Sequence, residues 1–246
     1  MVNREDLKNY CNDYLHVKKF KDYGPNGLQI EGKSSINKIV SGVSANLDLI
    51  EKAVDEKADA IFVHHGLFWD NETKHLVGAK RKKIALLLEH DINLFGFHLP
   101  LDDHPEVGNN VELGRLLGIS NINPVEDSLL WQGELNINLS KFSKLIEEKL
   151  DRVPQIFGRQ NGEIKKIAWC TGGAQGYIDD ALQLNIDLYL SGEVSEKTPA
   201  VAKENNITYI SAGHHATERY GVQAFCKHLS SEFNLQHKYI EIYNPV

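Results

Sequence analysis

The stretch IFVHHGLFWD, residues 61–70, opens with apolar residues and then changes to two histidines, a glycine and further large side chains. Its first half, rich in β-branched and aromatic residues, predicts a strand buried on both faces, as in a parallel sheet. Because side chains alternate along a strand, His64 and His65 can share one task only if the strand ends there and Gly66 turns the chain. We therefore expect a buried strand whose carboxyl end carries two imidazoles.

Strand and helix patterns alternate on both sides of this stretch. The pattern predicts an α/β protein in which helices cover mostly parallel or mixed sheets. In the first half the predicted strands are 36–45, 58–65 and 92–98, and the predicted helices are 46–57, 80–90 and 109–118. In the second half the predicted strands are 133–140, 164–170, 186–193, 207–213 and 237–243, and the predicted helices are 141–151, a segment after 171–177, 198–206 and 215–233.

The periodicity fails at residues 119–130, which include a proline, so a domain boundary is expected there. The expected units are residues 1–125 and 126–246, two similar α/β units with a metal site between them. ADAIFVHHG and ITYISAGHH each end an apolar strand with a histidine pair. This echo is too short to establish a repeat.

The composition is that of an ordinary globular protein: 246 residues, 41% hydrophobic and 25% charged. No apolar run approaches the roughly 20 residues of a membrane span, and the N-terminus lacks the apolar core of a signal peptide, so a cytoplasmic protein without a membrane partner is expected. Cys11, Cys170 and Cys226 lack CxxC spacing and are expected to be reduced thiols. The net charge of −7 argues against general binding to nucleic acid.

Polar groups follow several predicted strands, and in open α/β sheets the side chains that bind ligands gather beyond the carboxyl ends of the strands. His214 and Glu218 are four residues apart on a predicted helix and could bind one cation. His98 and Asp102 have the same spacing, but Pro100 predicts a loop there. The groups are HHG at 64–66, HLPLD at 98–102, SGE at 191–193 and GHHATE at 213–218.

These groups contain imidazoles and carboxylates, which suit Zn, Mn, Fe or Ni, whereas all-oxygen sets suit Mg or Ca. The candidate ions are Zn, Fe, Mn, Ni and Mg. Each pair taken singly has an ordinary structural alternative, but their coincidence at strand ends favours metal binding. Five ligands exceed a closed tetrahedral site, so we expect two divalent metal ions per subunit, about 3.5 to 4 Å apart and sharing Glu218. The expected metal ligands are His64, His65, Asp102, His214 and Glu218.

His98 and Glu193 are expected to act in catalysis beside the metal ions. His98 would orient Asp102 or move a proton, and Glu193 would support a ligand or accept a proton; a structural role is the alternative for both. His215 is expected to lie off the ligand face, and His104 in a loop.

Three further motifs have two readings each. KRKK at 80–83 either forms the charged, solvent-exposed face of a helix or binds phosphate. CTGGAQGY at 170–177 either cradles an anion with its backbone N–H groups or packs closely on the sheet. Phe68 and Trp69 either stack on a heterocycle or pack in the core or an interface.

With these motifs in this order, and with YGPNGLQIEG at 23–32, the chain resembles the YbgI-like dinuclear-metal family, whose members are called GTP cyclohydrolase 1 type 2 homologues. The resemblance spans nearly the whole chain and is to the short form without an inserted domain. It implies that the five expected ligands bind two metal ions, with Glu218 shared. It also implies a ring-shaped homohexamer, a trimer of dimers whose metal sites open toward a central cavity.

We expect a metal-dependent hydrolase, cyclohydrolase-like, that acts on a nucleotide or a modified heterocycle as its small-molecule substrate. A bridging hydroxide would attack an electrophilic centre. The alternative is a metal carrier or a regulatory interaction protein without turnover. A third possibility, nucleic acid threading the implied ring, would need a basic lining such as Lys80 to Lys83 and is opposed by the acidic net charge.

Overall fold

The computed structural model describes residues 1–246 and divides into two compact units. The first unit contains residues Met1–Gly108 and Gly221–Tyr243; the second contains Asn109–Tyr220 and Asn244–Val246. These bounds differ from the expected ranges 1–125 and 126–246. The difference arises because the helix at 109–116 packs in the core of the second unit, and the helix at 219–233 packs in the core of the first. No local sequence pattern reveals this exchange.

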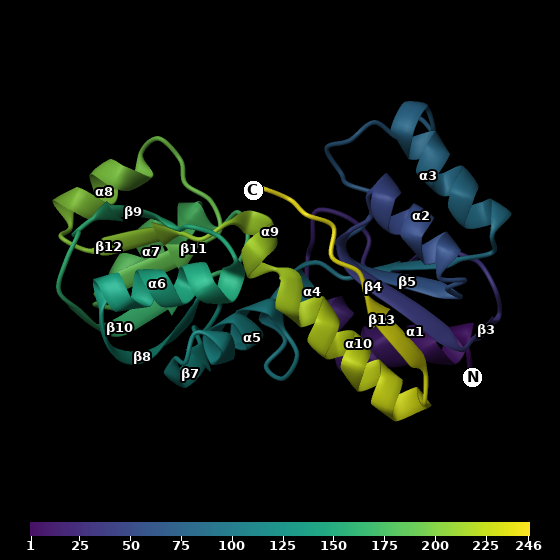
Figure 1. Ribbon diagram of the computed structural model, residues 1–246, viewed down its shortest axis with the longest axis horizontal. Coiled ribbons are helices and arrows are strands. Elements are labelled where there is room, and N and C mark those ends of the chain that lie inside the picture. The colour runs from purple at the N-terminus through teal and green to yellow at the C-terminus, as the bar shows by residue number, and fades with distance from the viewer. The chain divides into compact units, whose positions relative to one another are not determined.

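The first unit is a five-stranded mixed sheet with helices on both faces (Figure 1). Its elements are β1 (Val2–Asn3), α1 (Arg4–Tyr14), η1 (Val17–Lys19), β2 (Gly27–Ile30), β3 (Ser35–Ile36), β4 (Lys38–Ser44), α2 (Leu47–Asp55), β5 (Ala60–His65), α3 (Gly78–Glu89), β6 (Asn93–Gly96), α4 (Leu99–Asp103), α10 (Arg219–Phe233) and β13 (Gln236–Tyr239). The strand order is β13-β4-β5-β6-β2, in which only β2 is antiparallel to its neighbour.

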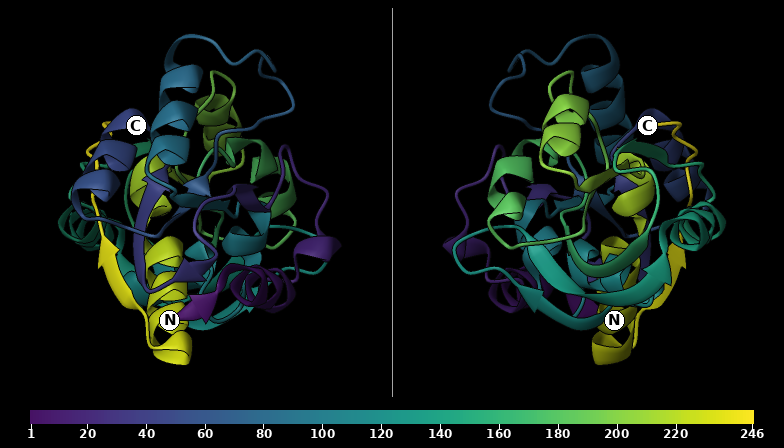
Figure 2. Two further views of the ribbon diagram at one scale, coloured as in Figure 1. Left: turned by 90° about the vertical axis from the view of Figure 1, so that its right-hand side faces the viewer. Right: turned by 90° about the vertical axis from the view of Figure 1, so that its left-hand side faces the viewer.

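Strand β5 lies in the middle of this sheet and is buried on both faces, as expected. Ile61 and Val63 pack with α2 and α3, whereas Ala60 and Phe62 pack with α1 and α10. The loop of residues 66–77 leads from β5 to α3 and arches away from the sheet (Figure 2). The strand therefore delivers His64 and His65 to one edge of the sheet, at the start of this loop.

The second unit is a six-stranded mixed sheet that is also covered on both faces (Figure 1). Its elements are α5 (Asn109–Leu116), β7 (Ser120–Pro124), β8 (Trp131–Asn138), α6 (Leu139–Leu150), β9 (Gln155–Gly158), β10 (Glu163–Trp169), η2 (Gln175–Tyr177), α7 (Ile178–Leu182), β11 (Leu188–Ser191), α8 (Thr198–Glu204), β12 (Thr208–Ser211) and α9 (His214–Thr217). The strand order is β7-β8-β10-β11-β12-β9, with β10, β11 and β12 parallel and the other pairings antiparallel.

Three expectations about single elements are wrong. Residues 120–124, placed in an aperiodic boundary, form β7 at the sheet edge. Pro100 lies in the first turn of α4 rather than in a loop, because a proline there interrupts no helical hydrogen bond. The long helix expected at 215–233 is broken at Glu218 into α9 and α10.

The two units repeat one topology. In each, an antiparallel strand (β2 or β9) precedes three parallel strands (β4-β5-β6 or β10-β11-β12) and pairs with the last of them. Asp59 enters β5 and accepts a hydrogen bond from the Lys38 amide at 3.0 Å; Asp187 enters β11 and accepts one from the Lys166 amide at 3.0 Å. Strand β5 thus corresponds to β11, and β6 to β12. The short sequence similarity between the ends of β5 and β12 is therefore a similarity between strands that are not equivalent in the fold.

Asp59 gives a testable dependence of stability on pH. Burial raises its pKa, but hydrogen bonds from Lys33 and from the amides of Lys38 and Asn37 outweigh burial and lower it. This carboxylate therefore stabilises the fold above its unfolded pKa near 3.8, and the contribution is lost as the pH falls through the lower folded value.

We expect Asp59→Asn to lose about 1–3 kcal/mol of unfolding free energy at pH 7. The difference from the parent protein should shrink at acidic pH. Urea unfolding at pH 7 and pH 3 measures it, with Asp55→Asn, an exposed residue of α2, as the control. A destabilisation of equal size at both pH values would contradict the assignment.

Candidate metal-binding side chains

Two imidazoles at the end of β5 are held in fixed orientations. His64 is buried, and its Nδ1 donates to the Phe97 carbonyl at 3.0 Å. His65 is half-buried, and its Nδ1 lies 3.0 Å from the Ser44 hydroxyl. Each ring would therefore bind a metal through Nε2, with the hydrogen bond at Nδ1 setting the direction of the ring. Gly66 follows directly, and a Cβ there would lie 2.3 Å from the Gln29 side chain.

A third histidine joins them in the first unit. The ligand atoms of His64, His65 and His98 all lie within 4.8 Å of one another. Asp102 is 6% exposed, and its carboxylate oxygen lies 3.5 Å from His64 Nε2. The structure thus brings together every residue that the sequence analysis assigned to this edge of the sheet, and a ligand atom of His98 lies within 4.8 Å of those of His64 and His65.

His98 is oriented by a residue that the sequence analysis missed. Its Nδ1 lies 2.6 Å from Asp22, whose side chain is 3% exposed and also accepts the Leu99 amide at 2.9 Å. Burial raises the pKa of Asp22, but hydrogen bonds from His98 and Asn26 outweigh it and lower the pKa. Asp22 therefore remains a carboxylate that fixes the ring. The only sequence signal was its place immediately before YGPNGLQIEG.

In the second unit, His214 lies between two carboxylates. Its Nδ1 is 2.7 Å from Glu193 and its Nε2 is 3.1 Å from Glu218, which is 3% exposed. Burial disfavours the charged ring, but hydrogen bonds to Glu218 and Glu193 raise the pKa of His214 to about 9. At neutral pH the His214 ring is therefore protonated, and its positive charge lies between the two carboxylates, a position suited to a cation. Glu193 lies where it can orient His214.

The glycine loop after β10 makes room for Glu218. Gly172 has φ +68°, and a Cβ on it would lie 2.0 Å from Glu218 Oε1 and 3.3 Å from His214 Nε2. Its amide donates to the Thr217 hydroxyl at 3.0 Å. Of the two readings of CTGGAQGY, this contact supports close packing, here around a carboxylate.

The two units carry the same arrangement of one histidine and two carboxylates at corresponding strand ends. In each, a histidine after the third parallel strand is held at Nδ1 by a carboxylate and is followed four residues later by a buried carboxylate. The sets are Asp22, His98 and Asp102 in the first unit and Glu193, His214 and Glu218 in the second. The parallel shows that both rings are anchored in the same way, with Nδ1 held and Nε2 left for a further partner.

The other polar motifs fall outside these groups. His104 Nε2 donates to the Tyr14 carbonyl, and the amide of His215 donates to the Val246 carbonyl. No group of potential metal ligands includes either histidine. The three cysteines are free and buried, and no helix has the length and apolar character that crossing a membrane requires.

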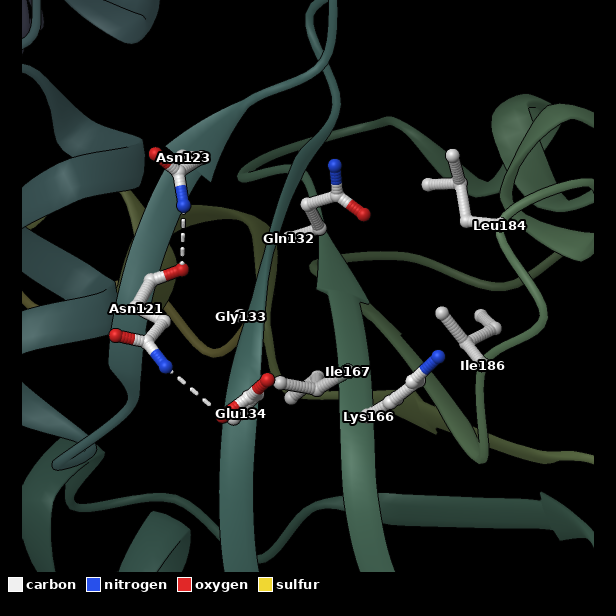
Figure 3. Close-up of a pocket in the computed structure, with 9 residues that line it drawn as sticks. All are labelled: Asn121, Asn123, Gln132, Gly133, Glu134, Lys166, Ile167, Leu184 and Ile186. Carbon is white, nitrogen blue, oxygen red and sulfur yellow. Dashed lines mark hydrogen bonds between the residues drawn. The ribbon is translucent and has the colours of Figure 1, made fainter.

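A pocket of about 230 Å³ lies on the second unit where β7, β8 and β10 present their side chains (Figure 3). Asn121 donates to Glu134 at 2.9 Å, and Asn123 donates to the Asn121 carbonyl at 2.8 Å. The pocket contains none of the expected ligands.

Comparison with known proteins places this geometry in a family. The family model described as Duf34/NIF3 (NGG1p interacting factor 3) matches residues 2–245. The chain belongs to this family. It is 48% identical over 249 residues to a GTP cyclohydrolase 1 type 2 homolog of Allochromatium vinosum, covering 100% of the chain and 98% of the relative. It is 47% identical over 238 residues to one of Pseudomonas aeruginosa, covering 94% of each.

Solved structures agree with the fold. A protein described as ybgI, of unknown function, superimposes with a TM-score of 0.96 at 42% identity over the full length of both chains. TTHA1606 from Thermus thermophilus superimposes with a TM-score of 0.93 at 29% identity, also over both full lengths. The expected resemblance and the α/β fold with mixed sheets are thereby confirmed.

The donor atoms fit a transition metal ion. Imidazoles anchored at Nδ1 and buried carboxylates are the ligand types that Zn, Mn, Fe and Ni accept, and no thiolate lies among them. Gly172 leaves the space that Glu218 needs beside His214. The residues present therefore fit the metal chemistry expected from the sequence.

Proposed function

We propose that the protein is a metal-dependent hydrolase that acts on a nucleotide or a modified heterocycle. The ligands would be His64, His65 and Asp102 from the first unit with His214 and Glu218 from the second, and Glu218 would be shared by two divalent ions. The observation that carries the proposal is that each unit places imidazoles anchored at Nδ1 beside a buried carboxylate, His64 and His65 with Asp102 in the first unit and His214 with Glu218 in the second.

When bound, the cations would lower the pKa of a water molecule and stabilise the charge that develops on an electrophilic carbon or phosphorus. The protein's own residues would control protons. Asp22 accepts from His98 Nδ1, which leaves Nε2 to take or return a proton. Glu193, whose side chain is 37% exposed, would orient His214 and could accept a proton through the solvent-accessible part of its carboxylate.

The test is turnover by metal-loaded protein on a panel of nucleotides and modified nucleosides. We expect saturable hydrolysis that His64→Ala abolishes, with His75→Ala, an exposed loop histidine, as the matched control. Equal rates in the parent protein and His64→Ala would reject the hydrolase. Rapid transfer of metal to a competing apo-protein, without hydrolysis of any compound, would favour the carrier instead.

We also propose, from the family resemblance, that the chain assembles as a homohexamer, a trimer of dimers. Light scattering coupled to size-exclusion chromatography tests this assembly. A monomeric or dimeric mass at micromolar concentration would reject it.

A further inference from the structure

A second pocket lies directly beside a proposed ligand, within the first unit. It measures about 350 Å³, which is within the size range of small-molecule sites. Its walls come from the end of β4, the start of α2, the loop after β5 and one face of α3. The residues that shape its chemistry are Asn46, His65, Trp69, Glu72, Lys80 and Lys83.

The two lysines differ in what they contact. They are three residues apart on α3, so both point to one side of the helix. Lys80 Nζ lies 3.5 Å from Glu72 and donates to the Thr73 carbonyl at 3.2 Å, so its charge is already matched. Lys83 is half-buried and forms no hydrogen bond or ion pair. Two lysines thus face one carboxylate, Glu72, so the pocket keeps one excess positive charge, and Lys83 is the lysine without a direct partner.

Burial of an ammonium group is unfavourable, and burial lowers the pKa of Lys83 although the charge of Glu72 acts in the opposite direction. An anion in the pocket would relieve this cost. The N-terminal end of α2, capped by Asn46, also faces the pocket and favours negative charge. Both features select an anionic group, and neither belongs to the expected ligand set.

Another part of the pocket's lining, Trp69, is aromatic and adjoins the histidines. The Trp69 ring centroid lies 5.9 Å from that of His65 and 5.0 Å from that of His98, to which it is nearly perpendicular. Trp69 is half-buried, so part of its surface remains accessible at the pocket. A planar heterocycle could stack there, next to the proposed metal ligands.

We propose that this pocket is the substrate subsite and that it binds a phosphorylated heteroaromatic compound. The phosphate contacts Lys83, and the heterocycle stacks on Trp69 beside His65. This inference rests on the proposed function, because His65 connects the pocket to the reacting centre. It assigns the run KRKK at 80–83 a ligand and narrows the substrate class to molecules that carry both a phosphate and an aromatic ring.

Calorimetric titration of metal-loaded protein with GMP, guanosine and inorganic phosphate tests the subsite. Lys83→Met should weaken GMP binding at least about tenfold and leave guanosine binding unchanged, because only the charge-assisted contact is lost. Trp69→Ala should weaken both GMP and guanosine. The matched control is Lys82→Met, an exposed neighbour on α3, which should bind all three probes as the parent does.

Metal content and thermal unfolding are measured on each variant, so that failure of the subsite is separable from failure of the metal centre. Undiminished GMP binding by a folded, metal-replete Lys83→Met protein overturns the proposal, as does absence of binding by every probe. Inorganic phosphate binding as tightly as GMP overturns the heteroaromatic part. Lys83-dependent GMP binding by protein that neither holds metal nor turns over would support the subsite while rejecting the hydrolase.

Discussion

A Glu218→Gln protein is expected to fold but to hold at most one metal equivalent, where the parent holds about two. The amide has nearly the shape of the carboxylate and can still contact His214 Nε2, now 3.1 Å from a Glu218 oxygen. It carries no charge, however, and cannot bridge two cations. Inductively coupled plasma mass spectrometry after reloading with Zn or Mn and desalting measures the result.

The control for this experiment is Glu204→Gln, an exposed glutamate at the end of α8. It should retain the metal content of the parent. If Glu218→Gln also retains it, Glu218 is not a shared ligand and the proposed centre is wrong in its central element.

A Gly172→Ala protein is expected to lose both stability and metal. The left-handed backbone at φ +68° costs a residue with a Cβ about 1–2 kcal/mol. In addition, the new Cβ would lie 2.0 Å from Glu218 Oε1, which must move from its buried position. We therefore expect a destabilisation of at least about 2 kcal/mol and a metal content reduced at least as much as in Glu218→Gln.

Gly118→Ala separates the two causes. Gly118 has φ +70°, but nothing lies within 4 Å of the Cβ that it would gain. This variant should show the backbone cost alone and keep its metal. Chemical unfolding and metal analysis on the pair decide the matter: equal losses in both variants would show that the Gly172 loop has no particular relation to Glu218.

The sequence predicted the elements that local patterns determine. Strand β5 was identifiable because a strand buried on both faces is a continuous apolar run, and the polar residues at its end stand out against that run. The i, i+4 pair His214 and Glu218 was equally visible and is in contact. Helix α4 was missed because the rule against proline inside helices does not apply to a first turn.

Long-range relations were beyond the sequence. Asp22 lies 76 residues from His98, and no periodicity connects them. The correspondence of β5 with β11 rests on the strand order and on the equivalent positions of Asp59 and Asp187. The similar sequences at the ends of β5 and β12 suggested a different correspondence. The partial charge balance of the pocket, with Lys80 matched by Glu72 and Lys83 without a direct partner, also required coordinates.

The exchange of α5 and α10 between the two units affects how the chain folds during translation. The first unit's core includes Val222, Phe225 and Leu229, which the ribosome adds only after residues 109–220 of the second unit. A nascent chain of the first 108 residues therefore has strands β4 to β6 and α1, but the part of the apolar face that α10 covers stays exposed. Folding from the N-terminus, as is common for multidomain chains, must here wait for the last helix, and truncated products should be prone to aggregation.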